Sequence, residues 1–332
     1  MNYIGSKNKL SSFIFDTVTT VAGNNLTQKV FCDLFAGTGI VGRTFKPFVK
    51  TVIANDVEHY SYVLNRNYIG NSTEFSSEKF VLKLNSLTPE KGFVFEEYSQ
   101  GGNAGRNYFN AENGMKIDAV RTQIEIWKGA SEITEDQYFF LLSSLLESAD
   151  KVANTASVYG AYLKHIKASA AKQFVLKPAV FQKTKSVHKV FQQDSNQLIR
   201  NISGDILYLD PPYNARQYGA NYHLLNTIAK YDTFVPEGKT GLRNYYKSNW
   251  CRTGEVLKCF EELIENAAFP YIFLSYNNEG LMSQMEVETV MKKFGKYSLK
   301  TKKYQRFKAD KTENRNHKAT NTTEFLHILE KR

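Results

Sequence analysis

Short apolar runs along the chain alternate with loops of small and polar residues. Four of these runs lead directly into a polar loop, and they cover residues 29–35, 51–56, 205–209 and 271–275. A helical stretch follows the second run, from residue 57 to about residue 68. Because strands that alternate with helices form parallel sheets, the pattern predicts a doubly wound α/β fold. Ligands bind such sheets beyond the carboxyl ends of the strands, where all four polar loops fall.

The C-terminal part of the chain has a different pattern. Residues 297–307 and 322–329 predict two strands, and the polar, basic segment 308–321 connects them. We therefore expect an antiparallel hairpin at the edge of the sheet, with positive charge concentrated at its tip.

The alternation of strands and helices is lost between residue 71 and about residue 187. Residues 118–127 and 134–149 have helical periodicity, with apolar side chains in the second stretch at Tyr138, Leu141, Leu142, Leu145 and Leu146. The pattern predicts a mainly helical insert at 71–185, between two parts of a sheet domain at 1–70 and 186–332.

Composition is that of a soluble globular enzyme, with 42% apolar and 23% charged residues in a chain of 332. No stretch approaches the run of about 18 apolar residues that spans a membrane, and the N-terminus lacks a secretory pattern. Cys32, Cys251 and Cys259 have no CxxC spacing, so neither a disulfide framework nor a structural zinc site is expected. We expect a cytoplasmic location and no membrane partner.

Positive charge is concentrated near the C-terminus. The net charge is +10, and residues 291–332 carry 13 Lys and Arg against 4 Asp and Glu, or 13 − 4 = +9. A basic surface attracts polyanions, so the charge favours nucleic acid as a partner. Charge alone equally fits a solvated basic tail.

A glycine-rich loop follows the first predicted strand. Residues 37–42 match GxGxxG, and Asp56 closes the next strand 17 positions after Gly39. Glycines let the backbone approach a ligand closely, and a carboxylate at a strand end can hold both ribose hydroxyls. The pattern indicates an adenosine-containing cofactor, either a dinucleotide or S-adenosylmethionine. A tight turn without a ligand is the alternative.

The tetrapeptide Asp210-Pro211-Pro212-Tyr213 follows the third apolar run directly. Two prolines fix φ twice and remove two donors, so the strand ends and the loop is stiff. The Asp210 carboxylate and the Pro211 carbonyl can accept both N–H groups of a planar amine, and Tyr213 can stack on a base. The alternative is an ordinary turn that terminates a strand.

Four segments occur in a characteristic order, and they are Tyr3-Ile4-Gly5-Ser6-Lys7, Asp33-Leu34-Phe35-Ala36-Gly37-Thr38-Gly39, Asp56 and Asp210-Pro211-Pro212-Tyr213. Together they resemble the alpha-group, Dam-like DNA adenine methyltransferases. The segments 154–164 and 210–225 resemble the restriction-modification branch of that family. The resemblance covers essentially the whole chain. It implies a Rossmann-like methyltransferase sheet, mostly parallel with an antiparallel C-terminal hairpin, plus an inserted target-recognition domain.

The resemblance also implies roles for individual residues. Tyr3 and Lys7 would contact the methionine end of S-adenosylmethionine, and Asp56 would hold its ribose. Its binding loop would contain Asp33, Phe35, Gly37 and Gly39. Asp194 would approach the adenine ring of the cofactor, although an acidic residue there can equally be a solvated helix cap. Asp210 would serve both the cofactor and the target amine.

The expected reaction is the direct transfer of a methyl group from S-adenosylmethionine to N6 of adenine in double-stranded DNA. Positioning and electrostatics would do most of the work, with Asp210 as an ionised acceptor. No metal and no cysteine nucleophile are required, so Cys32 is expected in the core. The histidines form no close pair.

The target base must leave the duplex before it reacts. Phosphate contacts would come from the predicted hairpin, through Lys302, Lys303, Arg306, Lys308, Lys311 and Arg315. The insert would read bases, with Tyr159, Tyr162, Lys164 and Arg216 as candidate contacts. Packing is the alternative reading for each tyrosine.

Other functions fit parts of the sequence. An RNA adenine methyltransferase or a cytosine-N4 DNA methyltransferase would use the same tetrapeptide. A nicotinamide dehydrogenase would use the glycine loop, but it leaves the tetrapeptide unexplained. A nucleic-acid-binding protein without catalysis is the last alternative. A cognate restriction endonuclease that acts separately would be a possible partner.

Overall fold

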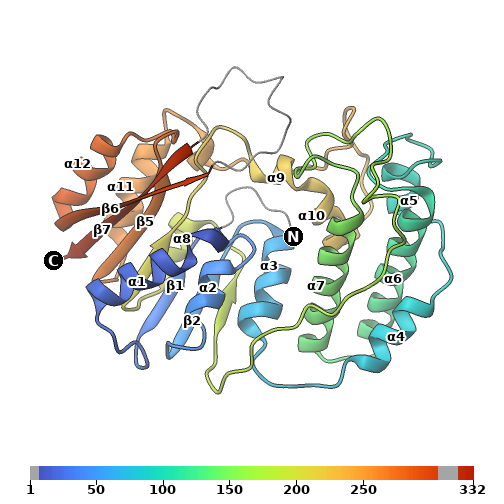
Figure 1. Ribbon diagram of the computed structural model, residues 1–332, viewed down its shortest axis with the longest axis horizontal. Helices are drawn as coiled ribbons and strands as arrows, with labels where there is room; N and C mark the ends of the chain where they lie inside the picture. Colours follow the sequence, from blue (N-terminus) through green and yellow to red (C-terminus); the bar gives the residue numbers. More distant parts are fainter. Residues whose placement is uncertain (1–6, 306–320) are drawn as a thin grey trace. The chain divides into compact units, whose positions relative to one another are not determined.

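The structure is a computed structural model, and it describes residues 7–305 and 321–332. The chain divides into two compact units, which we call the sheet unit and the helical unit (Figure 1). The sheet unit contains Gly5–Asn65, Thr184–Gln217 and Tyr246–Arg332, and the helical unit contains Arg66–Lys183 and Tyr218–Tyr245. The segment Tyr218–Tyr245 therefore belongs with the helices, whereas the sequence placed it in the sheet domain.

A seven-stranded sheet forms the centre of the sheet unit, in the order β3-β2-β1-β4-β5-β7-β6. Five strands run parallel, and β7 is antiparallel to both of its neighbours. The strands are β1 (Val30–Asp33), β2 (Thr51–Asn55), β3 (Lys189–Phe191), β4 (Ile206–Leu209), β5 (Tyr271–Asn277), β6 (Gly295–Gln305) and β7 (Asn321–Lys331). The predicted α/β sheet and its antiparallel C-terminal hairpin are confirmed.

Helices of the sheet unit pack on both faces of this sheet. They are η1 (Lys7–Lys9), α1 (Ser11–Ala22), α2 (Ile40–Phe45), α3 (His59–Asn65), α8 (Ser195–Leu198), η3 (Ile199–Asn201), η4 (Asn249–Cys251), α11 (Val256–Asn266) and α12 (Gln284–Phe294). Successive side chains of a strand point to opposite faces of the sheet. Phe31 of β1 stacks on Phe45 of α2 with ring centroids 4.0 Å apart. Its neighbour Cys32 joins the opposite core with Phe260 of α11, which agrees with the core position expected for this cysteine.

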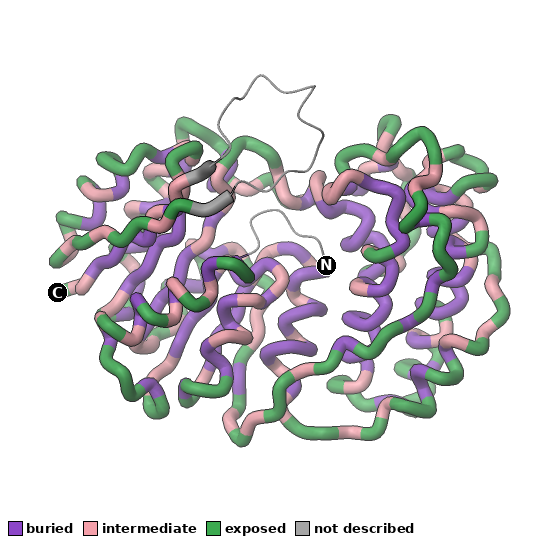
Figure 2. The backbone as a smooth tube through the Cα atoms, viewed as in Figure 1, coloured by how far each residue is buried: buried purple, intermediate pink, exposed green. Residues whose placement is uncertain are grey.

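The central strands are buried on both faces because helices cover both sides. All four residues of β4 are buried, and Figure 2 shows the strands of the sheet core in the colour of buried residues. The edge strands differ, since β3 and residues 295–303 of β6 are exposed or intermediate throughout. A near-continuous apolar run is typical of strands in a covered parallel sheet. The carboxyl ends of β1, β2 and β4 lead into the loops that carry the predicted chemistry.

Helices dominate the helical unit. They are η2 (Arg66–Gly70), α4 (Glu78–Ser86), α5 (Phe93–Tyr98), α6 (Ala111–Gly129), α7 (Glu135–Val152), α9 (Tyr218–Asn221) and α10 (His223–Lys230). A capping box begins α7, because the Thr134 side chain accepts from Gln137 N and the Gln137 side chain accepts from Thr134 N. The Asn110 side chain caps α6, which explains why this helix begins before the predicted residue 118. No helix within residues 7–305 and 321–332 is long and apolar enough to span a membrane.

Candidate active site

The glycine loop after β1 has a backbone that only glycine adopts readily. Gly37 and Gly39 have φ angles of 52° and 76°, in the left-handed region where a Cβ atom is strained. A Cβ on Gly39 would also lie 2.6 Å from Asn65 Oδ1. Asn65 Nδ2 donates to the Gly37 carbonyl at 3.0 Å, so α3 holds the loop in this shape.

Two carboxylates at adjacent strand ends also hold this loop. Asp33 Oδ2 accepts from Gly42 N at 2.9 Å. Asp56 Oδ2 accepts from Gly37 N at 2.8 Å, and its Oδ1 accepts from Glu58 N at 2.9 Å. Asp56 is only partly buried, so hydroxyl groups of a ligand can reach its carboxylate.

Burial changes the acid–base properties of both carboxylates. It raises the pKa of Asp33 to about 7; the Gly42 N–H lowers this pKa, and the charges of Asp210 and Asp56 raise it further. Burial is also the main cause of the raised pKa of Asp56, which the N–H groups of Glu58 and Gly37 oppose. Strands β2, β1 and β4 are parallel neighbours, so their carboxyl ends bring Asp56, Asp33 and Asp210 to one region of the sheet unit.

Asp210 lies at the carboxyl end of β4, next to Lys7 and Tyr213. Lys7 Nζ forms an ion pair with Asp210 Oδ1 at 2.9 Å and lies 4.6 Å from the centre of the Tyr213 ring. The Tyr213 hydroxyl is 2.7 Å from the same carboxylate oxygen. The Asp210 side chain is 20% exposed whereas Lys7 is 4% exposed, so the carboxylate is the accessible member of the pair.

The pKa of Asp210 is raised, mainly because the carboxyl group is buried. The Lys7 ammonium lowers the pKa, and the Glu324 carboxylate raises it. Sequence reasoning did not identify Glu324, which lies in β7, or Ser275 of β5, which donates to it. Only the pairing of β5 with β7 brings these side chains to the tetrapeptide, so no local sequence motif marks them.

Asp194 caps the short helix α8. Its Oδ1 accepts from Asn196 N at 3.0 Å and Gln197 N at 3.1 Å, and its Oδ2 accepts from the Tyr246 hydroxyl at 2.7 Å. The alternative reading of Asp194 as a helix cap is therefore observed. Gln193, the residue before Asp194, is held by Asn55 of β2. The Asn55 side chain forms two hydrogen bonds with the backbone of Gln193.

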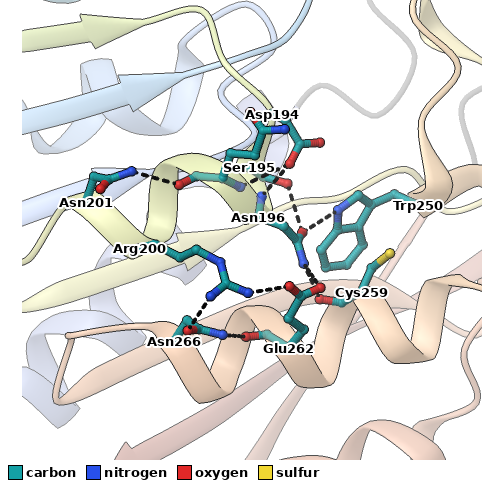
Figure 3. A network of polar contacts seen from close by, with 10 residues as sticks. Asp194, Ser195, Asn196, Arg200, Asn201, Trp250, Cys259, Glu262 and Asn266 are labelled. Carbon is teal, nitrogen blue, oxygen red and sulfur yellow. Dashed lines mark hydrogen bonds and ion pairs between the residues drawn. The ribbon is translucent and has the colours of Figure 1, made fainter.

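Asn196, beside Asp194, links α8 to α11 and η4 (Figure 3). Its side chain accepts from Trp250 Nε1 at 3.1 Å and donates to the Cys259 carbonyl at 2.9 Å. Trp250 and Phe35 pack edge to face, with ring centroids 5.0 Å apart. This network connects Phe35 of the glycine-rich segment to the region of Asp194, and the sequence analysis missed both Asn196 and Trp250.

The predicted DNA contacts lie in different environments. Lys164, Arg216 and Lys303 are exposed, and Tyr162 is intermediate. Lys302 is partly buried, with Nζ 5.4 Å from the centre of the Phe13 ring. Tyr3, Arg306, Lys308, Lys311 and Arg315 lie outside the described residues.

Tyr159 differs from the expectation of a DNA contact. It is 1% exposed, and its hydroxyl donates to Asp150 Oδ1 at 2.9 Å. Its carbonyl accepts from the Tyr108 hydroxyl at 2.6 Å. Tyr159 is therefore a packed core residue, which was the alternative to a DNA contact in the sequence analysis.

The strand order, the glycine loop with its two carboxylates and the Asp-Pro-Pro-Tyr loop at the end of β4 define an α/β methyltransferase that acts on an amino group. The chain belongs to the D12 class N6 adenine-specific DNA methyltransferase family, whose model matches residues 3–292. The family expected from the sequence is confirmed. The protein is an adenine-specific DNA methyltransferase, and membership in the family implies the use of S-adenosylmethionine.

Several individual relatives are Type II methyltransferases. The chain is 62% identical over 332 residues to the Type II methyltransferase M.NlaIII of Neisseria lactamica, covering 100% of this chain and 99% of that protein. It is 38% identical to the Type II methyltransferase M.CviAII of Paramecium bursaria Chlorella virus 1, covering 93% of both. It is 39% identical to the Type II methyltransferase M.FokI of Planomicrobium okeanokoites, but this match covers 89% of the chain and 47% of that protein.

Proposed function

We propose that Asp210 is the catalytic acceptor that prepares the adenine amino group for methylation. The observation that supports this role is the accessible Asp210 carboxylate, held between Lys7 and Tyr213 at the end of β4. The carboxylate and the Pro211 carbonyl accept the two N–H groups, which directs the nitrogen lone pair toward the methyl donor. Asp210 also compensates the positive charge that develops on nitrogen.

The residues around the glycine loop hold the cofactor. When bound, S-adenosylmethionine supplies an electrophilic methyl group on sulfonium sulfur. Asp56 accepts hydrogen bonds from the ribose, and Gly37 and Gly39 allow close approach of the backbone. With S-adenosylmethionine bound, the adenine nitrogen would form a bond to the methyl carbon as the carbon–sulfur bond breaks, and S-adenosylhomocysteine would leave as a neutral thioether. Asp210 would pass the excess proton of the nitrogen to water. Asp194 and Phe35 lie at the two ends of the network that would border the adenine ring.

DNA contacts in the helical unit follow a lysine-rich segment. From Lys151 to Lys183, the part that lies in the helical unit, the sequence contains six lysines and no acidic residue. Residues 170–180 of this segment, which we call the strap, form neither a helix nor a strand. Phe174, Leu176 and Ala179 are buried there, while Lys172 and Lys177 are exposed. A positively charged segment without acidic residues of its own suits the phosphate backbone of DNA.

Side chains from neighbouring helices fix the strap. Asn113 accepts from Phe174 N at 2.8 Å and donates to the Lys172 carbonyl at 2.9 Å. Asn85 accepts from Leu176 N at 2.9 Å and donates to the Leu176 carbonyl at 3.1 Å. A segment held at successive residues presents its lysines in a defined arrangement, so little entropy is lost when they bind phosphate. We assign phosphate contacts to Lys172 and Lys177, in addition to Lys164.

A methylation assay tests the catalytic role. The purified protein is incubated with labelled S-adenosylmethionine and with duplex DNA, single-stranded DNA or RNA, and the products are hydrolysed to nucleosides. We expect N6-methyladenine in duplex DNA at one recognition sequence. Asp210→Ala should lower kcat by about 100-fold or more while DNA binding remains. Wild-type turnover in this variant would contradict the role of Asp210.

The names of the relatives support a role in protection against a restriction endonuclease. We propose that this methylation blocks cleavage by a separate, cognate endonuclease. DNA from cells that express the wild-type protein or Asp210→Ala is digested with nucleases of the same sequence specificity, once methylome sequencing has identified the site. Protection by the wild-type protein alone is expected, and equal cleavage of both DNA samples would refute the proposal.

A further inference from the structure

Glu324 is a buried carboxylate that neither the sequence motifs nor the expected mechanism uses. It lies in β7 opposite Asn277 of β5 and is 1% exposed. Its Oε2 is buried and has no hydrogen-bond partner within residues 7–305 and 321–332. Burying a carboxylate costs several kcal/mol unless other groups compensate its charge, so its contacts need an explanation.

The other oxygen of Glu324 faces the catalytic tetrapeptide. Glu324 Oε1 lies 3.3 Å from Lys7 Nζ and 2.9 Å from the Tyr213 hydroxyl, and it accepts from the Ser275 hydroxyl. Lys7 and Tyr213 are also the two side chains that contact Asp210. Glu324 and Asp210 therefore contact the same ammonium and the same phenol.

The cluster contains one ammonium and two carboxyl groups, and it is largely buried. Lys7 comes from η1, Asp210 from the loop after β4, and Glu324 from β7, so the cluster joins three distant parts of the chain. Such a cluster is weak evidence for stability alone, because the desolvation of its charges offsets their attraction.

We propose that Glu324 is a positioning residue for methyl transfer, which holds Lys7 and Tyr213 against Asp210. The role rests on the proposed function of Asp210. Without Glu324, the Lys7 ammonium and the Tyr213 hydroxyl each lose a carboxylate neighbour. The tetrapeptide then samples more orientations, and small errors in the position of an acceptor slow a displacement reaction strongly.

Glu324 also affects the charge state of the acceptor. Burial raises the pKa of Asp210, Lys7 lowers it, and Glu324 raises it. Removing the Glu324 charge while retaining its shape therefore shifts the Asp210 pKa downward. A residue that served the fold alone would leave the pH profile of catalysis unchanged.

The test compares Glu324→Gln with Glu330→Gln as a matched control. Glu330 lies in the same strand, but it is only partly buried and pairs with Lys296 at 2.7 Å. We expect Glu324→Gln to lower kcat about tenfold or more and to move the acid limb of the kcat profile to lower pH. The melting temperature shows whether the variant folds, and Glu330→Gln should behave as wild type. Wild-type kcat and an unshifted acid limb in Glu324→Gln would overturn the proposal.

A second variant covers the case in which Glu324→Gln does not fold. Glu324→Asp keeps the charge but withdraws the carboxylate by one methylene group. We expect kcat to fall while the acid limb stays near its wild-type position, and unchanged kcat would again overturn the proposal. Absence of adenine methylation by the wild-type protein would instead count against the proposed function itself, so the two failures are distinguishable.

Discussion

Asp33 accepts a hydrogen bond from Gly42 N at 2.9 Å, although its environment disfavours the ionised carboxylate. Burial raises the pKa of Asp33 to about 7, and the charges of Asp210 and Asp56 add to this effect. Between the ordinary value of 3.8 and about 7, the folded protein binds more protons at Asp33 than the unfolded chain. The contribution of Asp33 to the free energy of unfolding therefore decreases as the pH rises through this window.

The first prediction concerns Asp33→Asn, which removes this charge and keeps an oxygen acceptor for Gly42 N. We expect the variant to melt several degrees higher than wild type at pH 8, with a smaller difference at pH 5. Its affinity for S-adenosylmethionine should fall. Thermal melts at both pH values and titration calorimetry measure the two effects. A variant that is less stable than wild type at pH 8 would contradict the assigned charge state.

The main strands of the sheet were predictable because their sequences are strongly apolar. Ile206–Leu209 is buried at every residue, as its sequence indicates. Strand β3 was missed because Lys189–Phe191 is short and has no apolar run. Its place at the edge depends on pairing with β2 and on the bonds between Asn55 and Gln193. The polar loop expected after residue 275 begins later, because Tyr276 and Asn277 continue β5 and pair with β7.

Residues of the site were predictable only where they belong to a local motif. The glycine loop and Asp210 stand next to strand ends, so the order of the elements brings them together. Glu324 has no such signal, since its neighbours in space are far away in the sequence. Tyr159 was chosen as a candidate DNA contact although it is buried. Its sequence neighbours do not indicate that its hydroxyl donates to Asp150 in the core.

The second prediction follows from the environment of Asp210. Its raised pKa means that the carboxyl group gains a proton at higher pH than an ordinary aspartic acid. Because the proposed acceptor must be ionised, kcat should fall with decreasing pH along a limb centred above 3.8. Single-turnover rates measured from pH 4 to 9, with circular dichroism at each pH, test this. Constant rates down to pH 4 in the folded protein would be inconsistent with Asp210 as the acceptor.

The third prediction tests the position of Tyr159. Tyr159→Phe removes a buried hydrogen bond to Asp150 and leaves the ring in place, so the free energy of unfolding should fall by about 1–2 kcal/mol. The affinity for DNA and the recognition sequence should remain those of wild type. Denaturant unfolding and methylome sequencing measure these outcomes. A changed recognition sequence with unchanged stability would restore Tyr159 as a base contact.

The fourth prediction concerns the lysines of the strap. If Lys172 and Lys177 each contact one phosphate, replacing both with alanine should reduce the slope of log K against log salt concentration by about 2. Binding should weaken uniformly for specific and nonspecific DNA, because phosphate contacts carry no sequence information. Fluorescence anisotropy at several salt concentrations gives the slope.

Lys258→Ala on α11, which removes an exposed lysine of the sheet unit, is the control and should leave the slope unchanged. Since both strap side chains are exposed and the strap is held through its backbone, the melting temperature should not change. An unaltered slope in the double variant would exclude the strap from the DNA interface, even if the enzyme remained fully active.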